Sequence, residues 1–377
     1  MTSEPLRVAL VLASSVGGIG RHVASLTRGL IGRGIEVSVC CPAATEAKFD
    51  FAGLGARVHP LEIPANPAAA DLAVVSRLRR LLRGPDREAP MHVVHAHGLR
   101  AGLVAAWARP SAIPLVVTWH NAVLGTGLAG RAGRFAERLV ARAAEVTLAA
   151  SPDLVDRAEA LGANEVRLGP VAAPALRPPT RDRDEIRAEF DAGDRPLIVS
   201  VGRLHPQKGY EVLVRTAARW RELSPPPLVL IAGTGPSYRD LAGEILAQRA
   251  PVILVGHRDD VSDLLAAADL AVVTSRWEAR QLFAQEALAA GVPVVATAVG
   301  GLPSLLGDAA VLIAPGDPDA LDLAVRELLA DADLRAHYAE AGLRQAGQWP
   351  TEQDTIEQVL GVYNELTDRA RADRAGA

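Results

Sequence analysis

The sequence contains almost no cysteine. Only Cys40 and Cys41 occur among 377 residues, and adjacent cysteines do not normally pair with each other in a structural disulfide. The sequence also lacks the cysteine and histidine spacings that are typical of zinc sites. These absences exclude a disulfide-stapled secreted scaffold and predict a protein of the reducing cytoplasm.

Long apolar runs are missing as well. No stretch of about 18 consecutive apolar residues is present, so no transmembrane helix is predicted. A short apolar run, Val8–Ala13, follows Glu4 and precedes a glycine-rich turn, which predicts a first β-strand and not a signal peptide. Apolar residues make up 49% of the chain and charged residues 22%, a composition that excludes global disorder.

Lysine is scarce and charge is uneven. Only Lys48 and Lys208 are lysines among 40 basic residues, so each stands out against a background of arginine. Residues 1–180 hold 20 basic and 14 acidic residues, a net charge of +6, whereas residues 181–377 hold 20 and 30, a net charge of −10. This asymmetry indicates either two domains that face different partners or a chance difference between two domains.

Apolar strands alternate with helical segments along the whole chain, which predicts parallel sheets covered on both faces. A proline-rich stretch at 169–182 lacks periodicity and is interpreted as an interdomain linker. We therefore expect an α/β fold of two Rossmann-like domains, residues 1–175 and 176–349, facing each other across a cleft. A helix over Thr355–Leu366 follows. The strands expected are Arg7–Ala13, Glu36–Cys41, Val58–Ile63, Met91–Ala96, Leu115–Thr118, Glu145–Ala149, Leu197–Val201, Leu228–Ala232, Val252–Val255, Leu270–Thr274, Val292–Thr297 and Val311–Ala314.

A glycine turn, Gly17-Gly18-Ile19-Gly20, separates the first strand from a helix expected at His22–Arg33. Such a turn can bring backbone amides and a helix N-terminus to a phosphate. It can equally be a tight turn and nothing more. A dinucleotide fingerprint is disfavoured because the spacing is not G-x-G-x-x-G and the second strand ends without an acidic residue for a ribose.

Two further segments carry charge to strand ends. Arg203 follows a strand, and Lys208 lies five residues on at a helix start, so together they can neutralise a diphosphate. Glu278 lies on a loop after another strand. Glu286, eight residues later, is expected to begin a helix, where its carboxylate would accept hydroxyl hydrogen bonds as from a ribose. The alternative is a solvated loop and a solvated helix start.

No metal site is predicted. Two Asp-x-Asp sequences occur, at 182–184 and 317–319, but the first lies in the linker and the second precedes a helix, where Asp317 or Asp319 fits an N-cap. Among the histidines, His95 is expected in the core, and His97 and His120 end strands at the cleft. No role is assigned to His22.

This set of motifs resembles the family-4 retaining glycosyltransferases of GT-B architecture, especially their actinobacterial members. The resemblance spans essentially the whole chain and implies a metal-independent transfer of a hexosyl unit, with retention, from a nucleoside-diphosphate sugar to a hydroxyl acceptor. It implies that Arg203 and Lys208 bind the diphosphate, that Glu286 binds the ribose, and that Glu278 and His120 contact the sugar. It also implies that helix 350–377 crosses back onto the N-terminal domain. The remaining donor-site residues implied are Gly17, Gly18, Gly235, His257, Arg258, Gly300 and Gly301.

The sequence departs from the family pattern between the two glutamates. Where the family usually shows Gly-Phe-Gly-Leu, this chain has Ala279-Arg280-Gln281-Leu282, and Ser304 replaces a glutamate in a later motif. The lost glycines normally allow close approach of backbone amides to the sugar. Two alternatives therefore stay open, a nucleotide-sugar epimerase of the same architecture and a non-catalytic nucleotide-sugar-binding protein. The choice between UDP and GDP also stays open, and no nucleic acid partner is predicted.

Two basic segments suggest a peripheral membrane contact. Residues 77–83 mix arginine with leucine, and Arg131, Arg134, Arg138 and Arg142 share one helical face. Basic amphipathic helices of this kind bind anionic lipid surfaces. We therefore expect a peripheral contact with the cytoplasmic membrane face, where the protein would reach a lipid-linked acceptor. The alternative is that both are solvated faces of helices whose leucines lie in the core.

Overall fold

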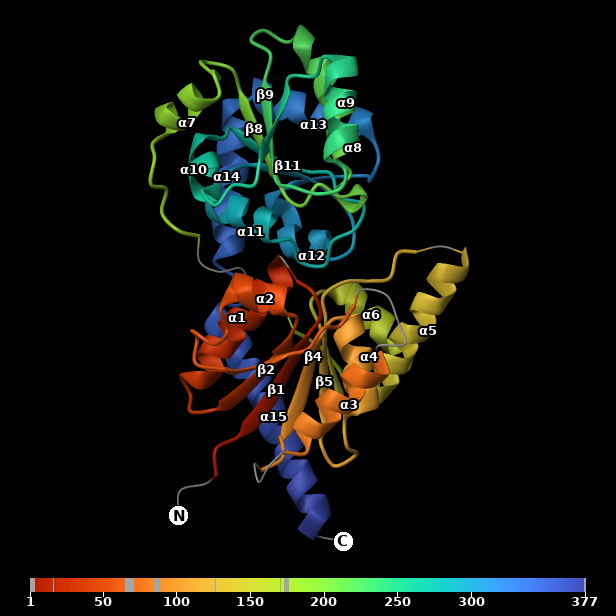
Figure 1. The fold of residues 1–377 in the computed structure, drawn as a ribbon. Coiled ribbons are helices and arrows are strands. Elements are labelled where there is room, and N and C mark those ends of the chain that lie inside the picture. The colour runs from red at the N-terminus through yellow and green to blue at the C-terminus, as the bar shows by residue number, and fades with distance from the viewer. Residues whose placement is uncertain are drawn as a thin grey trace. The chain divides into compact units, whose positions relative to one another are not determined.

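The computed structural model describes residues 4–15, 17–64, 71–84, 89–125, 127–169, 171–172 and 176–375. The chain divides into two compact units (Figure 1). The N-terminal unit comprises Met1–Pro174 together with Pro350–Ala377, and the C-terminal unit comprises Ala175–Trp349. Each unit is an α/β layer structure with its own parallel sheet, which confirms the predicted fold class.

The N-terminal unit contains a seven-stranded sheet in the order β3-β2-β1-β4-β5-β6-β7, parallel throughout. Its strands are rich in valine and leucine because parallel strands are buried on both faces. The strands are β1 Arg7–Leu12, β2 Glu36–Cys41, β3 Arg57–Pro60, β4 Val93–His97, β5 Leu115–Trp119, β6 Val146–Ala149 and β7 Val166–Leu168. The helices are α1 Gly18–Ile31, α2 Ala43–Phe49, α3 Asp71–Leu82, α4 Leu99–Ala108, α5 Gly127–Ala143, α6 Pro152–Ala160 and α15 Glu352–Ala375.

Helices cover both faces of this sheet (Figure 1). Helix α1 contacts α15 on one face, and α3, α4 and α5 contact one another in sequence on the other. The amphipathic pattern of α1 buries Val23, Leu26 and Leu30 in a core shared with β1, β2 and β4. Gly20 permits this packing, because a Cβ at that position would lie 2.1 Å from the Phe49 ring of the chain segment around α2.

The C-terminal unit contains a six-stranded parallel sheet in the order β10-β9-β8-β11-β12-β13. Buried clusters line both faces of it. The strands are β8 Leu197–Val201, β9 Leu228–Ala232, β10 Val252–Gly256, β11 Leu270–Val273, β12 Val294–Thr297 and β13 Val311–Ile313. The helices are α7 Arg183–Glu189, α8 Tyr210–Arg219, α9 Tyr238–Gln248, α10 Val261–Ala267, α11 Leu282–Ala289, α12 Leu302–Leu306, α13 Pro318–Ala330 and α14 Ala332–Ala346, with 3₁₀ turns at Pro206–Lys208, Trp220–Glu222 and Gly307–Ala309.

The predicted strands are all present, with ends that shift by up to three residues. Strand β7 was not predicted, because its three residues are too short to show a period. Helix α1 begins at Gly18 and not at His22, so the glycine turn is itself the first turn of the helix. No helix among the described residues is long and apolar enough to cross a membrane.

Candidate functional site

Both sheets reverse their winding direction once, and ligands of open parallel sheets bind beyond the carboxyl ends of the strands at that point. In the N-terminal sheet the reversal lies between β1 and β4, and in the C-terminal sheet it lies between β8 and β11. The register pairs Leu12 with His97 at the first position. Among the residues selected from the sequence, Gly17 and Gly18 follow β1, and Arg203, Lys208 and Glu278 follow β8 and β11, so each unit presents its own candidate surface.

An ion pair marks the reversal point of the C-terminal sheet. Lys208, which follows β8, places its Nζ 2.5 Å from Oε1 of Glu278, which follows β11. The Ser275 hydroxyl donates a second hydrogen bond of 2.7 Å to the same oxygen. Both charged side chains are largely buried. One carboxylate oxygen therefore holds the lysine, which keeps two further N–H groups for a ligand.

The Glu278 loop is held by two glycines. The amide of Gly301 donates a 2.8 Å hydrogen bond to the Glu278 carbonyl oxygen. Gly300 has a φ of +52°, and a Cβ there would lie 2.1 Å from that same oxygen. Any other residue at 300 would therefore displace the loop. These glycines fix the position of the Glu278 backbone, and this is the role that the structure gives them.

Backbone contacts also join the loops that follow β8, β9 and β10. The Leu204 amide donates to Thr234 O at 2.9 Å, and the Gly233 amide donates to Gly256 O at 2.6 Å. A Cβ at Gly235 would lie 2.2 Å from the Leu204 carbonyl oxygen. Gly235 is therefore required for close approach of two loops. These contacts hold the loop that carries Arg203 against the loops that follow β9 and β10.

Arg203 and Glu286 occupy different settings. The Arg203 side chain is exposed and makes no hydrogen bond or ion pair with any other residue that the structure describes. Glu286 is half-buried in the second turn of α11. The expectation that Glu286 begins the helix is wrong, because α11 begins at Leu282, with Gln281 as its N-cap. The run Leu282–Ala284 is apolar and continues the helix toward its N-terminus.

The two residues selected for the nucleotide base lie after β10. His257 is exposed, with Nε2 3.2 Å from Oδ1 of Asp259. Arg258 donates to Asp260 at 2.5 and 2.7 Å and to Glu189 at 2.7 Å. These two carboxylates raise the pKa of Arg258 above its ordinary value, with the hydrogen bond to Asp260 as the largest cause. The Arg258 side chain therefore ties its loop to the end of α7, and the loop backbone and the exposed His257 ring remain for a base.

The segment that departs from the family pattern is buried. The Arg280 guanidinium lies over the Trp349 ring, 5.7 Å from its centroid, and Nε donates to Oε1 of Gln285 at 3.3 Å. Burial lowers the pKa of Arg280 to about 10. Nη2 of Arg280 and Oε1 of Gln281 are both buried without a hydrogen-bond partner among the described residues. The segment thus places one donor and one acceptor without partners immediately before α11.

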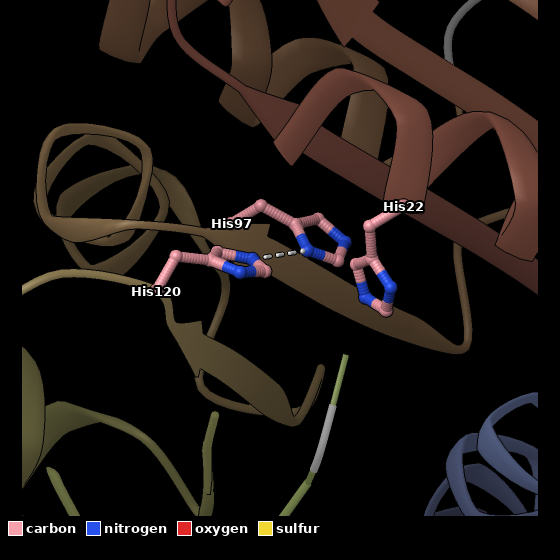
Figure 2. Close-up of side chains that lie close together, drawn as sticks. All are labelled: His22, His97 and His120. Carbon is pink, nitrogen blue, oxygen red and sulfur yellow. Dashed lines mark hydrogen bonds between the residues drawn. The ribbon is translucent and has the colours of Figure 1, made fainter. Parts of the chain in front are cut away.

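Three histidines gather at the reversal point of the N-terminal sheet (Figure 2). His22 comes from α1, His97 ends β4, and His120 follows β5. Nδ1 of His97 lies 3.3 Å from Nε2 of His120, and the His22 ring lies 5.5 Å and 5.4 Å from the other two ring centroids. All three are at least nine-tenths buried. The structure therefore adds His22 to the residues that the sequence indicated.

Burial keeps these imidazoles uncharged. It lowers the pKa of His22 to about 4 and lowers the pKa of His97 and of His120 well below the ordinary value. Neutral imidazoles hold one donor and one acceptor nitrogen each. Nε2 of His97 is buried and has no partner among the described residues. The cluster therefore offers hydrogen bonds to a hydroxyl group without adding charge.

A second hydrogen-bonded chain supports the cluster from behind. His95, fully buried in β4 as expected, bonds Tyr363 Oη at 2.6 Å through Nδ1 and Thr118 Oγ1 at 2.7 Å through Nε2. Its ring centroid lies 4.2 Å from that of His97. Tyr363 belongs to α15, so the C-terminal helix contributes to the positioning of these residues. The sequence could not show this, since 268 positions separate the two partners.

The glycine turn lies at the same edge. Gly17 is the N-cap of α1 and Gly18 its first residue, and no side chain caps this end of the helix. The only amide of this turn with a side-chain partner among the described residues is that of Gly20, which donates to Ser15 Oγ at 3.0 Å. A Cβ at Gly17 would meet nothing within 4 Å. Open space and a free helix end at this position suit a polar group of a ligand.

The two Asp-x-Asp sequences have structural roles, and the three histidines form a possible metal-binding group. Asp182 is the N-cap of α7 and Asp317 is the N-cap of α13, and each accepts hydrogen bonds from backbone amides. An N-cap was expected for the Asp-x-Asp sequence at 317–319. Nitrogens of His22, His97 and His120 lie within 4.8 Å of one another, the only group of this kind among the described residues. Three imidazoles are also the protein ligands of catalytic zinc sites, in which water is the fourth ligand, so the ligand chemistry of this group fits a metal ion.

Two family models match the sequence. Residues 17–174 match the model described as "Glycosyl transferase 4-like domain", and residues 182–345 match the model described as "Glycosyl transferases group 1". The two matches therefore divide the chain in the same way as the two sheets do.

Individual relatives extend over nearly the whole chain. Glycogen synthase of Mycobacterium tuberculosis is 30% identical in an alignment of 383 positions that covers 91% of each protein. D-inositol 3-phosphate glycosyltransferase of Corynebacterium diphtheriae is 26% identical and covers 93% of this chain and 90% of the relative. Among solved structures, Anabaena HepE in complex with UDP and glucose superposes with a TM-score of 0.81 at 19% identity, covering 95% of this chain and 99% of HepE.

Proposed function

Because this chain belongs to the family-4 retaining glycosyltransferases, which transfer a sugar from a nucleotide-sugar donor to an acceptor, we propose that its donor is a UDP-sugar bound by the C-terminal unit. Arg203 and Lys208 carry this proposal. They are two cations beyond β8 at the reversal point of the sheet, and the Arg203 side chain makes no hydrogen bond or ion pair with a described residue that would compete with a ligand. The UDP in the similar HepE structure favours UDP over GDP.

The chemistry requires charge stabilisation at the leaving group. When the bond between the anomeric carbon and the phosphate oxygen breaks, negative charge builds on the UDP diphosphate and positive charge builds on the sugar ring. Arg203 would bind the diphosphate through its planar N–H groups, and Lys208 would use the two N–H groups that Glu278 leaves open. Donors already in place stabilise developing charge at little reorganisation cost.

The remaining polar groups divide between ribose, sugar and acceptor. Glu286 would accept hydrogen bonds from the ribose diol, and Glu278 would orient the transferred sugar. In the N-terminal unit His120, aligned by His97, would contact the sugar or the acceptor hydroxyl. The acceptor oxygen forms the new bond to the anomeric carbon, and its proton passes to the departing phosphate oxygen. Arg203 and Lys208 would supply the charge that a divalent cation supplies elsewhere, so we propose a metal-independent reaction.

The acceptor in this proposal is a hydroxyl compound, and the net charge of +6 in residues 1–180 favours one that is linked to a lipid. Such an acceptor would require the enzyme to work at the cytoplasmic membrane face.

Titration calorimetry with UDP and GDP tests the donor assignment. Arg203→Ala is expected to weaken UDP binding by about 1.5–3 kcal/mol, the usual range for a hydrogen bond to a charged group. Arg221→Ala is the matched control, since Arg221 is exposed and, among the residues that the structure describes, its side chain donates only to the Ala218 carbonyl oxygen. Equal UDP affinity in wild type and Arg203→Ala would refute the assignment. Tighter binding of GDP than of UDP would refute the choice of base.

A further inference from the structure

Helix α5 exposes an apolar stripe that the rest of its unit does not cover. The exposed fraction is 81% for Leu128, 63% for Phe135 and 38% for Leu139. These residues, together with exposed Ala132, follow one another at steps of four and three, so they share one side of the helix. Leu124, just before the helix, is also half exposed. Large apolar side chains that gather on one surface mark an interaction site.

Four arginines run beside this stripe. Arg131, Arg134, Arg138 and Arg142 are all exposed. The first three make no hydrogen bond or ion pair with any residue that the structure describes. We call the stripe Leu128, Ala132, Phe135 and Leu139, with these four arginines, the α5 outer face. It combines uncompensated positive charge with apolar surface.

The one acidic residue of α5 points away from this face. Glu137 is 2% exposed and accepts hydrogen bonds from Arg157 of α6, at 2.6 Å, and from the Val123 amide, at 2.9 Å. Val140 and Ala141 are buried beside it. The inner side of α5 thus anchors the helix to its unit, and the exposed side carries positive charge only. Figure 1 shows α5 at the outside of the N-terminal unit.

The other basic segment selected from the sequence has a different structure. In α3 the leucines Leu78, Leu81 and Leu82 are buried, and the arginines between them face solvent. Arg79 donates to the carbonyl oxygen of Ala108 and to that of Trp107 in α4. This segment is therefore an ordinary amphipathic helix packed on its unit. The leucines of this segment lie in the core, whereas the apolar residues of the α5 outer face are exposed.

We propose that the α5 outer face docks the protein on an anionic lipid bilayer. A helix in the plane of the interface buries its apolar stripe among the acyl chains, and flanking arginines reach the lipid phosphates. An acidic protein groove would satisfy the arginines. However, the spread of leucine and phenylalanine over the whole length of the helix suits a continuous apolar phase. The α5 outer face would be the place of the membrane contact in the proposed function, on which this inference rests. Vesicle binding is measured without any donor or acceptor, so its result is independent of the proposed activity.

Vesicle co-sedimentation tests this surface with charge-matched variants. The wild type is expected to bind vesicles of phosphatidylcholine with 30% phosphatidylglycerol (roughly the anionic content that gives a strong surface potential) and not pure phosphatidylcholine, and to dissociate as salt rises. The triple variant Arg131→Gln, Arg134→Gln, Arg138→Gln is expected to partition on the order of a hundredfold more weakly. The control removes the same charge from the α3 segment, as Arg77→Gln, Arg80→Gln, Arg83→Gln, and is expected to bind like the wild type.

A second pair of measurements separates the alternatives. Phe135→Ser with Leu139→Ser is expected to lose anionic vesicle binding while its circular dichroism and UDP affinity stay unchanged, because both residues are exposed. No binding of the wild type at low salt, or equal losses in the two triple variants, would overturn the proposal. A dimer in analytical ultracentrifugation that dissociates in the Phe135→Ser, Leu139→Ser variant, without vesicle binding by the wild type, would assign the α5 outer face to a second copy of the chain. UDP binding in all variants would leave the proposed function standing in either case.

Discussion

At the scale of single residues, we expect the ion pair of Lys208 and Glu278 to contribute to both donor binding and stability. Lys208→Ala would leave a largely buried Glu278 carboxylate with Ser275 as its one side-chain hydrogen-bond partner among the described residues. We expect a loss of about 2 kcal/mol in the free energy of unfolding, below the ~3–5 kcal/mol of a fully buried pair because both side chains keep some solvent contact.

The double variant Lys208→Ala, Glu278→Gln removes the unpaired charge and serves as the control. It is expected to recover more than half of the lost stability in urea unfolding while UDP binding stays weak. A double variant that is no more stable than Lys208→Ala would show that the charge of Glu278 is not the cause. Recovery of UDP binding in the double variant would contradict the diphosphate role of Lys208.

The histidines make stability depend on pH. Burial lowers the pKa of His95 to about 3 and of His22 to about 4, against 6.5 in the unfolded chain, so the unfolded state takes up more protons below pH 6.5. The free energy of unfolding therefore falls as pH falls from 6.5 toward 4. Each such imidazole contributes a loss of about 1 kcal/mol between pH 6.5 and 5.5, a range above the titration of most carboxylates.

Comparison of His22→Gln with wild type isolates one of these groups. The slope of unfolding free energy against pH between 6.5 and 5.5 is expected to decrease by about 1 kcal/mol per pH unit in the variant. Exposed His257 provides the control, since His257→Gln removes a histidine without removing a buried one. Identical slopes for His22→Gln and wild type would mean that His22 is charged or solvated in the folded protein.

Some site residues were within reach of the sequence and others were not. Arg203, Lys208 and Glu278 follow apolar strands directly, and strand ends in a parallel sheet predict the edge on which such residues lie. His22 lies within a helix, and its neighbours in the cluster are 75 or more positions away. The more distant partner of Arg258 was equally hidden, because Glu189 ends α7, 69 positions away in the sequence.

At the scale of elements, the loop that carries Glu278 depends on the start of α12. Gly300→Ala places a Cβ 2.1 Å from the Glu278 carbonyl oxygen at a φ of +52°, so the loop must shift. We expect turnover to fall at least tenfold, because a displacement of about 1 Å at a reacting group is enough for a large loss. Gly316→Ala is the control: it has a φ of +74° but no atom within 4 Å of the added Cβ.

Initial-rate and thermal-melting measurements on both variants separate strain from displacement. Both variants are expected to melt at lower temperature, because each places a side chain at positive φ. Only Gly300→Ala is expected to lose turnover beyond its loss of stability. Equal turnover in the two variants would show that the Glu278 loop does not need the close approach of Gly300.

Helix boundaries were the least predictable feature at this scale. Helix α11 begins four residues before Glu286, because the apolar run Leu282–Ala284 has no turn residue to separate it from the rest of the helix. Helix α1 includes the glycines that suggested a loop. Only proline has a weaker helix preference than glycine, so a sequence rich in glycine predicts a loop. In the structure, packing of Gly20 against Phe49 accompanies a helix that includes these glycines.

At the scale of the whole molecule, apolar strands and glycine turns were enough to predict two parallel α/β sheets. The signal was strong because parallel strands are buried on both faces and appear as continuous valine and leucine runs. Strand order was beyond the sequence, since β1 pairs with β4 and β8 with β11 across two intervening strands. The order decides which loops meet, and therefore where the candidate sites form.

Deletion of the C-terminal helix would test whether the two units are stable independently of each other. Helix α15 is joined to the end of the C-terminal unit, yet it buries Ile356, Val359, Val362, Tyr363 and Leu366 in the core of the N-terminal unit. Removing residues 350–377 would expose that core and break the hydrogen bond from His95 to Tyr363. We expect the amides of β1 and β4 to lose protection in hydrogen exchange, whereas those of β8 and β11 keep theirs, because the core of the C-terminal unit contains no residue of α15.

Removing only residues 372–377, which follow the buried positions in the sequence, should leave both sheets protected. Loss of protection in both sheets after the longer deletion would show that the units fold as one cooperative structure.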